Sequence, residues 1–252
     1  GVEVTEIDTA EVASRYPHLN TDGVVSAVYL PLDGQGDPGN IALSLARGAK
    51  LNGAKIHEGV AVTALQKQGR RVTGVEWQSE AGDTGVIACE HVINCGGMWA
   101  REVGLMAGTN VPLQACEHFY IVSDKIAGLG ALPVLRVPDE CAYYKEDAGS
   151  MMLGAFEPVA KPWALGGIPK DFEFDQLPED VDHFEPILEK AINRMPILAE
   201  TGIPTFSNRP ESSTPANHYH LALLPELYTV WVQVVFTSIS ISSAGRAGMA
   251  PP

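Results

Sequence analysis

The chain has 252 residues, 45% of them apolar and 19% charged, and its 17 basic and 31 acidic side chains give a net charge of −14. This length and apolar content suffice for the core of one large domain or two intertwined ones. The acidic balance argues against a nucleic-acid or anionic-membrane surface, because such surfaces need clustered Lys and Arg. No apolar run has the length of a membrane span, and the first residues do not form a signal peptide.

The four cysteines are widely spaced and form no CxxC pair: Cys89, Cys95, Cys116 and Cys141. This spacing predicts reduced core residues and no metal site. We therefore expect an intracellular protein, cytoplasmic in a bacterium or in the mitochondrial matrix of a eukaryote. Because the chain begins without Met and ends on two prolines, we also expect it to be a piece of a longer protein.

The first 53 residues predict two helices and two strands. A strand over 2–7 is followed by a short helix over 10–16, for which Thr9 is the expected N-cap. Residues 24–32 predict a second strand. A helix over 39–53 is expected to begin with Asp37 as N-cap and Pro38 at the first helical position, and to stop at Gly53.

The next segment, residues 54–97, is rich in Val, Ile and Thr and is divided by tight turns such as Gln68-Gly69 and Ala81-Gly82. It predicts about four strands, and a helix over 100–108 is expected to follow. Further strands are expected in four ranges: 115–123, 131–137, 142–146 and 150–156. A Pro- and Gly-rich loop over 157–178, an amphipathic helix over 179–195, a strand over 228–236 and a helix start within 237–250 complete the prediction. The predicted fold class is mixed α/β of the α+β type.

One short stretch, "VINCGGMWA" at residues 92–100, is an apolar strand that runs into two glycines and a tryptophan. Glycine has no side chain, so the backbone here turns with positive φ or lets another group approach closely. A tight strand-to-helix turn with Trp99 in the core is the commoner explanation, because turn glycines outnumber cofactor glycines. A ligand pressed against the bare backbone is the alternative.

The order of these features resembles the flavin-dependent amine oxidoreductases of the D-amino-acid oxidase superfamily. The closer resemblance is to the dimethylglycine and sarcosine dehydrogenase branch, which includes the regulatory subunit of pyruvate dehydrogenase phosphatase. It rests on several segments in family order, among them "YLPLDGQGDP", "NGAKIHEGVAVTAL", "HVINCGGMWAREVGLMAGTNVPL", "CEHFYIVSD", "YYKEDAG" and "DHFEPILEKAINRMP".

This resemblance implies a partial FAD-binding domain intertwined with a substrate domain built on an antiparallel sheet. The expected division is a substrate-domain portion over 1–30, a partial FAD-binding domain over 31–112, the substrate domain over 113–228, and a return to the FAD-binding domain over 229–252. The implied cofactor is FAD, and the residues implied to line it are Val62, through its backbone, Cys95, Gly96, Gly97, Trp99, Ser238, Ile239 and Ser240.

The resemblance also implies an amine substrate. His118 would keep the amine nitrogen unprotonated, and Tyr143 would bond the amine or its carboxylate, with Tyr144 as the adjacent alternative. The simpler explanation of His118 is a half-buried histidine bonded to a neighbouring strand. Alternation predicts that His118 and Tyr120 share a face of their strand. Asp182-His183 is interpreted as a helix start, and His218 and His220 as residues of a surface loop.

The sequence departs from the family pattern at both ends. It has no GxGxxG turn to receive the FAD pyrophosphate, no N-terminal histidine for a covalent flavin bond, and no following folate domain. Val235, Ser240 and Arg246 replace expected small residues. A β-branched side chain where backbone must touch a ring costs about 1–3 kcal/mol, which argues against FAD binding by this chain alone.

Two hypotheses remain. The chain is part of an FAD-dependent dehydrogenase of N-methylated glycine-type amines, or it is a non-catalytic regulatory module like the phosphatase subunit. The expected partners are a small amine, a missing N-terminal flavin segment and a C-terminal folate domain. Without the first βαβ unit, the chain is expected to expose apolar sheet surface and to be poorly soluble.

Overall fold

The computed structural model describes residues 3–214, 220–224, 227–234 and 248–249. The chain divides into two compact units, each built from separate stretches of sequence. Unit 1 comprises Gly1–Gly36, Glu117–Lys161 and Glu173–Pro210, and unit 2 comprises Asp37–Cys116, Pro162–Phe172 and Glu211–Pro252. The predicted mixture of helices and strands is confirmed, and several predicted elements are recovered within a few residues.

Unit 1 begins with two short antiparallel strands, β1 (Thr5–Ile7) and β2 (Ala27–Tyr29), and α1 (Thr9–Arg15) lies between them in the sequence. The N-cap of α1 is Asp8, whose carboxylate accepts a hydrogen bond from the Glu11 amide at 2.8 Å. The expected cap, Thr9, is instead the first helical residue, so that prediction is wrong by one position.

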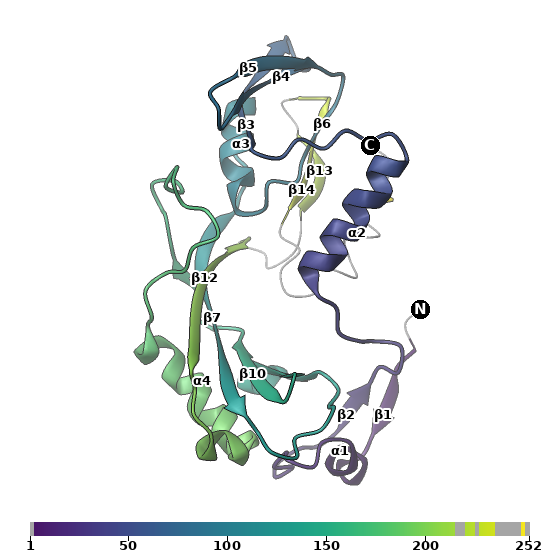
Figure 1. Cartoon of the computed structure of the whole chain (residues 1–252), viewed down its shortest axis with the longest axis vertical. Helices are drawn as coiled ribbons and strands as arrows, with labels where there is room; N and C mark the ends of the chain where they lie inside the picture. Colours follow the sequence, from purple (N-terminus) through teal and green to yellow (C-terminus); the bar gives the residue numbers. More distant parts are fainter. Residues whose placement is uncertain (1–2, 215–219, 225–226, 235–247, 250–252) are drawn as a thin grey trace. The chain divides into compact units, whose positions relative to one another are not determined.

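One six-stranded sheet runs in the order β11-β7-β10-β9-β8, and β12 also pairs with β7. Figure 1 labels three of these strands, β7, β10 and β12. Its strands are β7 (Gln114–Lys125), β8 (Leu135–Val137), β9 (Ala142–Asp147), β10 (Ser150–Ala155), β11 (Lys161–Pro162) and β12 (Thr205–Ser213). The pairs β7–β10, β10–β9 and β9–β8 are all antiparallel. Such a sheet buries one face and leaves the other more open, which explains the alternation along β7.

The long helix α4 (Val181–Arg194) covers the buried face of this sheet. Phe184 and Ala191 of α4 are fully buried beside Phe119 and Ile121 of β7 in one hydrophobic cluster. The helix is N-capped by Asp180, whose carboxylate accepts from the His183 amide at 3.1 Å. The interpretation of Asp182-His183 as a helix start is therefore confirmed.

A polar network joins the N-terminus of α4 to β7. Lys161 lies 2.6 Å from Asp180 and 3.1 Å from Glu117, and the Asn208 amide donates to Glu117 at 2.6 Å. Asn208 is almost fully buried and also donates to the Pro178 carbonyl at 2.7 Å. These bonds fix β12 and the start of α4 against β7, because buried polar groups need partners.

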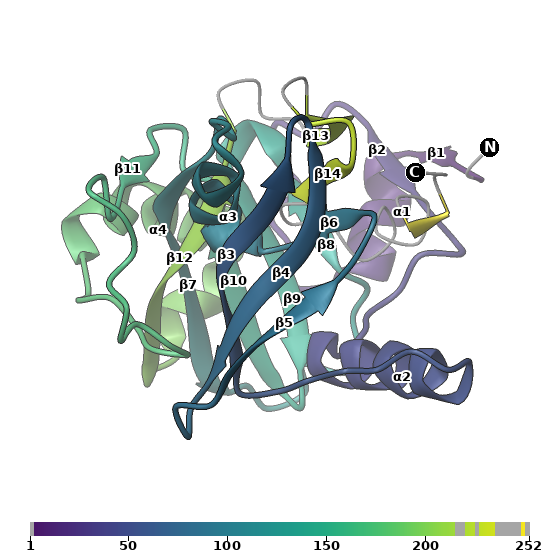
Figure 2. The same cartoon turned by 90° about the horizontal axis from the view of Figure 1, so that it is seen from above.

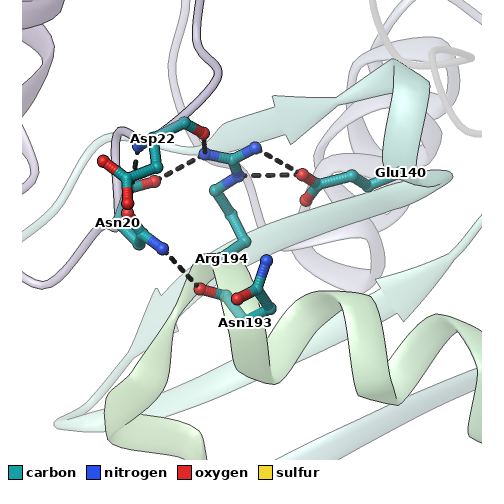
Figure 3. Close-up of polar contacts among 5 residues, drawn as sticks. All are labelled: Asn20, Asp22, Glu140, Asn193 and Arg194. Atoms are coloured by element: carbon teal, nitrogen blue, oxygen red, sulfur yellow. Dashed lines mark hydrogen bonds and ion pairs between the residues drawn. The ribbon is translucent and has the colours of Figure 1, made fainter.

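A second network closes the other end of α4 (Figure 3). Arg194 donates through Nε and Nη2 to Glu140 Oε1 at 2.9 and 2.5 Å. Its Nη1 donates to the carbonyl oxygens of Asn20 and Asp22 at 2.6 and 3.1 Å. The Asn20 amide in turn donates to the Asn193 carbonyl at 3.2 Å. The Arg194 guanidinium thus joins α4 to two other segments of unit 1, one at residues 20–22 and one at Glu140.

Unit 2 contains an antiparallel meander of three strands, β3 (Val60–Gln68), β4 (Arg71–Ser79) and β5 (Thr84–Ala88), which lie side by side in Figure 2. The strand β6 (Val92–Asn94) pairs in parallel with β14 (Val230–Val234), which pairs antiparallel with β13 (His220–Leu223). The expected strands within 54–97 are confirmed. His220 opens a strand, so its interpretation as a loop residue is wrong, and His218 lies outside the described residues.

Two helices complete the described part of unit 2. The helix α3 (Ala100–Ala107) ends at Gly108, which adopts φ 82°, and it buries Ala100, Gly104 and Ala107. The helix α2 (Pro38–Leu51) has the expected Asp37 cap, with the Asn40 amide donating at 2.6 Å. Within the described part of the chain no residue of α2 is fully buried, and its Leu51 is 81% exposed. The expected helix start within 237–250 falls largely outside the described residues.

Of the four cysteines, Cys116 is buried, Cys95 is exposed and the other two are half-buried, so the expectation that all four lie in the core is wrong. All four are free thiols. Across the described ranges, no set of three or more His, Cys, Asp or Glu side chains has an arrangement that could hold a metal ion. No helix in the described part of the chain is both long enough and apolar enough to cross a membrane.

Candidate active site

The open face of the unit 1 sheet holds the residues predicted to meet the amine. Along β7, Phe119 and Ile121 are buried, whereas His118 and Tyr120 are half-buried. The strand alternates, so His118 and Tyr120 share the face opposite the core, as the sequence predicts. Tyr120 is paired with Gly154, and Gly154 with Tyr143. The structure thus places His118 and Tyr143 on the same face of one sheet.

Tyr143 lies across a glycine on the neighbouring strand. A Cβ atom built on Gly154 would collide with the Tyr143 ring, so the ring covers the bare backbone of Gly154. The ring of Phe156 lies 5.4 Å from that of Tyr143, and the Arg136 guanidinium lies 4.3 Å from the centre of the Phe156 ring. An aromatic surface with a cation beside it is a suitable surface for a small amine that carries a carboxylate.

The adjacent alternative, Tyr144, faces the other way. Its ring is fully buried in the core of unit 1. Burial, together with the nearby Glu140 carboxylate, raises the pKa of Tyr144 well above its ordinary value. A side chain in this position packs the core, so of the two tyrosines only Tyr143 lies on the open face.

His118 is held by a carboxylate that the sequence did not indicate. Its Nδ1 lies 3.0 Å from Glu157 Oε2, and Glu157 Oε1 accepts a hydrogen bond from the Phe119 amide at 2.8 Å. The Glu157 side chain is 7% exposed and that of His118 is 21% exposed. His118 is therefore a half-buried histidine bonded to a neighbouring segment, as the simpler explanation expects. This bonding is compatible with a role of His118 in the site.

The ionisation of Glu157 responds to two opposed effects. Burial disfavours the charged carboxylate, but the hydrogen bond and charge of His118 and the Phe119 amide outweigh burial, and the pKa of Glu157 lies below its ordinary value. A carboxylate with a lowered folded-state pKa stabilises the fold above its unfolded-state pKa, and this contribution is lost as the pH falls through the folded-state value.

We therefore expect Glu157→Gln to remove part of the acid sensitivity of unit 1. Denaturant titrations over a pH series from neutral to acid would measure this. The parent chain should lose stability in acid more steeply than Glu157→Gln, and the two curves should converge at the lowest pH. Parallel curves over the whole series would contradict the expectation.

The Gly96-Gly97 turn in unit 2 has two different causes. A Cβ on Gly96 would lie 3.1 Å from Asn94 Oδ1 and 3.2 Å from the Ala100 nitrogen, so the chain itself crowds this position. Asn94 is buried, accepts from the Gly96 amide at 3.1 Å and donates to the Ala100 carbonyl at 2.8 Å. Gly97 has φ +54°, and no atom of the described residues lies within 4 Å of a Cβ built on it. Crowding within the turn explains why residue 96 is a glycine, whereas the space beside Gly97 is open among the described residues.

The other residues predicted to line a flavin are accessible. Trp99 is 42% exposed and Val62 is 41% exposed, so Trp99 is not the ordinary core residue of the simpler explanation. Cys95 is also exposed. Val62 lies on β3, an edge of its three-stranded sheet among the described residues, next to a register shift between Val62 and Ala64. An edge strand keeps backbone N–H and C=O groups available to a ligand. These residues are therefore accessible to a cofactor.

The remaining predicted cofactor residues, Ser238, Ile239 and Ser240, lie outside the described residues. Sequence reasoning missed Glu157, Arg136, Phe156 and Asn94. Glu157 lies two residues after the buried end of β10, and a carboxylate so close to such a strand was the available signal. Asn94 was also visible, because a polar residue ending the apolar run of β6 commonly bonds the next turn.

Comparison with known proteins then identifies the lineage. Residues 1–230 match the family described as FAD dependent oxidoreductase. The chain belongs to this family. Within it, the chain is 36% identical over 249 residues to 4-methylaminobutanoate oxidase (formaldehyde-forming) of Paenarthrobacter nicotinovorans, covering 98% of the chain and 30% of that protein. It is 34% identical over 253 residues to mouse mitochondrial sarcosine dehydrogenase, covering 98% of the chain and 27% of the relative.

The regulatory subunit of mouse mitochondrial pyruvate dehydrogenase phosphatase is 33% identical over 252 residues, covering 98% of the chain and 28% of that protein. The chain thus spans less than a third of the length of these oxidoreductase-family relatives. Among solved structures, L-proline dehydrogenase from P. horikoshii superimposes with a TM-score of 0.78 at 21% identity, covering 94% of the chain and 60% of that protein. The family and branch expected from the sequence are confirmed.

Proposed function

We propose that this chain is part of an FAD-dependent oxidoreductase that oxidises a small N-methylated, glycine-type amine. The observation that supports this most directly is the open sheet face of unit 1, where His118 and Tyr143 lie on one side of the same antiparallel sheet. The relatives named for sarcosine and 4-methylaminobutanoate support the choice of an N-methylated amine.

FAD, when bound, supplies the acceptor for the hydride that leaves the methyl carbon of the amine. The chain's own task is to bind the amine and remove its N–H proton, because only a nitrogen with a free lone pair can assist that departure. His118 suits proton removal near neutral pH, and the Tyr143 hydroxyl can orient the amine or its carboxylate. Val62, Cys95, Gly97 and Trp99 would contact the cofactor in unit 2.

The test is a visible absorption scan of the purified chain after incubation with FAD and removal of the excess. Retained flavin absorbance, followed by turnover of sarcosine, dimethylglycine or 4-methylaminobutanoate, would support the proposal and rank the substrates. A folded chain that retains flavin and turns over none of the three amines would overturn it.

The second candidate is a non-catalytic regulatory module, and the 33% identity to the phosphatase regulatory subunit favours it. The two candidates differ in one measurable respect, since a regulatory module has no need for His118. Replacement of His118 should therefore leave a regulatory function intact and remove an oxidative one.

The open space at Gly97 provides a sharper test of flavin contact. Gly97→Ala should lower the free energy of unfolding by about 1–2 kcal/mol, because alanine is strained in the left-handed backbone conformation. It should also weaken FAD retention by at least about tenfold, because the added methyl group would enter the proposed contact. Gly69→Ala is the matched control. Gly69 has φ +59°, and its built Cβ likewise has no described atom within 4 Å, but Gly69 lies in the β3–β4 hairpin turn. Equal FAD retention by the two variants would count against a flavin at Gly97.

A further inference from the structure

The carboxylate of Glu157 touches two successive residues of β7. Oε2 lies 3.0 Å from His118 Nδ1, and Oε1 accepts from the Phe119 amide at 2.8 Å. Since both oxygens are engaged, the carboxylate has a fixed orientation relative to the β7 backbone. The side chain is also almost completely shielded from water, which strengthens both hydrogen bonds.

We propose that Glu157 is a positioning residue that keeps the proton of neutral His118 on Nδ1, so that the lone pair lies on Nε2. This inference rests on the proposed function and specifies how its base is prepared. A neutral imidazole has one N–H and one lone pair, and the hydrogen bond at one nitrogen decides which nitrogen holds each. An ionised carboxylate only accepts, so the nitrogen that faces it must donate.

The consequence for the reaction is directional. With the N–H on Nδ1, the proton of a bound ammonium group passes to Nε2, and the imidazolium that forms is stabilised by the Glu157 carboxylate on the opposite side of the ring. The proton stays on His118, and the amine keeps the electron pair of its former N–H bond. With the opposite tautomer, Nε2 would carry a hydrogen and could not accept the proton.

The replacement Glu157→Gln is informative because the Phe119 amide constrains the new side chain. The single oxygen of glutamine is needed by that amide, so the NH₂ group faces His118 Nδ1 and donates to it. Nδ1 must then be the acceptor, and the hydrogen moves to Nε2. Glu157→Ala, which removes both contacts, is the second variant and does not depend on how an amide is oriented.

The primary readout is the tautomer of His118, measured from the ¹⁵N shifts of its ring in the chain without cofactor, at a pH where the ring is neutral. His118→Asn assigns the signal by its loss. The matched control is Glu146→Gln, because Glu146 also accepts a backbone hydrogen bond in unit 1, from Gly149 at 2.8 Å. We expect the Nδ1–H form in the parent and in Glu146→Gln, and the Nε2–H form in Glu157→Gln.

An Nε2–H parent, or a parent whose tautomer both Glu157 variants retain, would overturn the inference. In the chain that turns over amine, Glu157→Gln should also lower kcat at least about tenfold with little change in KM, as expected when a base is misdirected. A parent that retains FAD and shows the predicted tautomer without any turnover would refute the proposed function and leave the role of Glu157 supported. Normal turnover, with a His118 tautomer that both Glu157 variants retain, would support the proposed function and overturn the role of Glu157.

Discussion

His118→Asn is expected to lower kcat/KM for the N-methylated amine by about 10²–10⁴-fold, the usual contribution of a positioned general base. Asparagine keeps a polar group of similar reach but cannot take a proton near neutral pH. Because His118 is half-buried on the open face of the sheet, the replacement removes little core packing. The loss should therefore be in chemistry rather than in folding, and steady-state kinetics beside a circular dichroism spectrum would separate the two.

The expected pH dependence makes this prediction more specific. The parent should lose activity in acid as the base becomes protonated, and the residual activity of His118→Asn should lack that step. His57→Asn is the control, since His57 is an exposed histidine of unit 2 without a role in the site. If His118→Asn and His57→Asn turned over amine equally fast, His118 would not be the base.

Arg194→Met is expected to destabilise unit 1 by about 3–5 kcal/mol, because it leaves the Glu140 carboxylate buried without its charge partner. The side chains of Arg194 and Glu140 are 11% and 17% exposed. Glu140 Oε2 is buried with no hydrogen-bond partner among the described residues, and so is the Tyr144 hydroxyl, so the loss of the guanidinium would add to an existing deficit. The carbonyl groups of Asn20 and Asp22 would lose their donor as well.

Arg15→Met is the matched control for this prediction. Arg15 also contacts a glutamate, Glu11, at 2.6 Å, but their side chains are 39% and 44% exposed, and the pair lies within one helix. Exposed pairs of this kind contribute below about 1 kcal/mol. Urea denaturation followed by circular dichroism would compare the two variants. Equal midpoints would mean that the burial of the Arg194 pair has no energetic consequence.

Local signals in the sequence predicted much of the fold. Asp37 followed by Pro38 marked the start of α2, and Gly108 marked the end of α3 through its positive φ. The richness in Val, Ile and Thr and the tight turns over 54–97 marked β3 to β6. Each of these signals acts within a few residues, where backbone geometry and capping decide the outcome.

Elements that depend on distant partners were missed. The strand β12 contains Ser207, Asn208 and Pro210, residues that disfavour a strand on their own, and it forms because it pairs with β7. The candidate site shows the same limit. Both His118 and Tyr143 stand in segments that resemble the family, whereas Glu157 meets His118 across 39 residues of sequence, through the pairing of β7 with β10.

The discontinuity of unit 1 has a consequence for the synthesis of the chain on the ribosome. Tyr16 is buried in the same cluster as Met195 and Leu198, so this cluster cannot be completed until the C-terminal part of that unit has emerged. At about 5–20 residues per second, the N-terminal segment waits roughly 10–40 s for those partners. During that interval Tyr16 and the apolar face of α1 are accessible to chaperones. Premature termination before α4 would leave a nascent chain that cannot complete its first core.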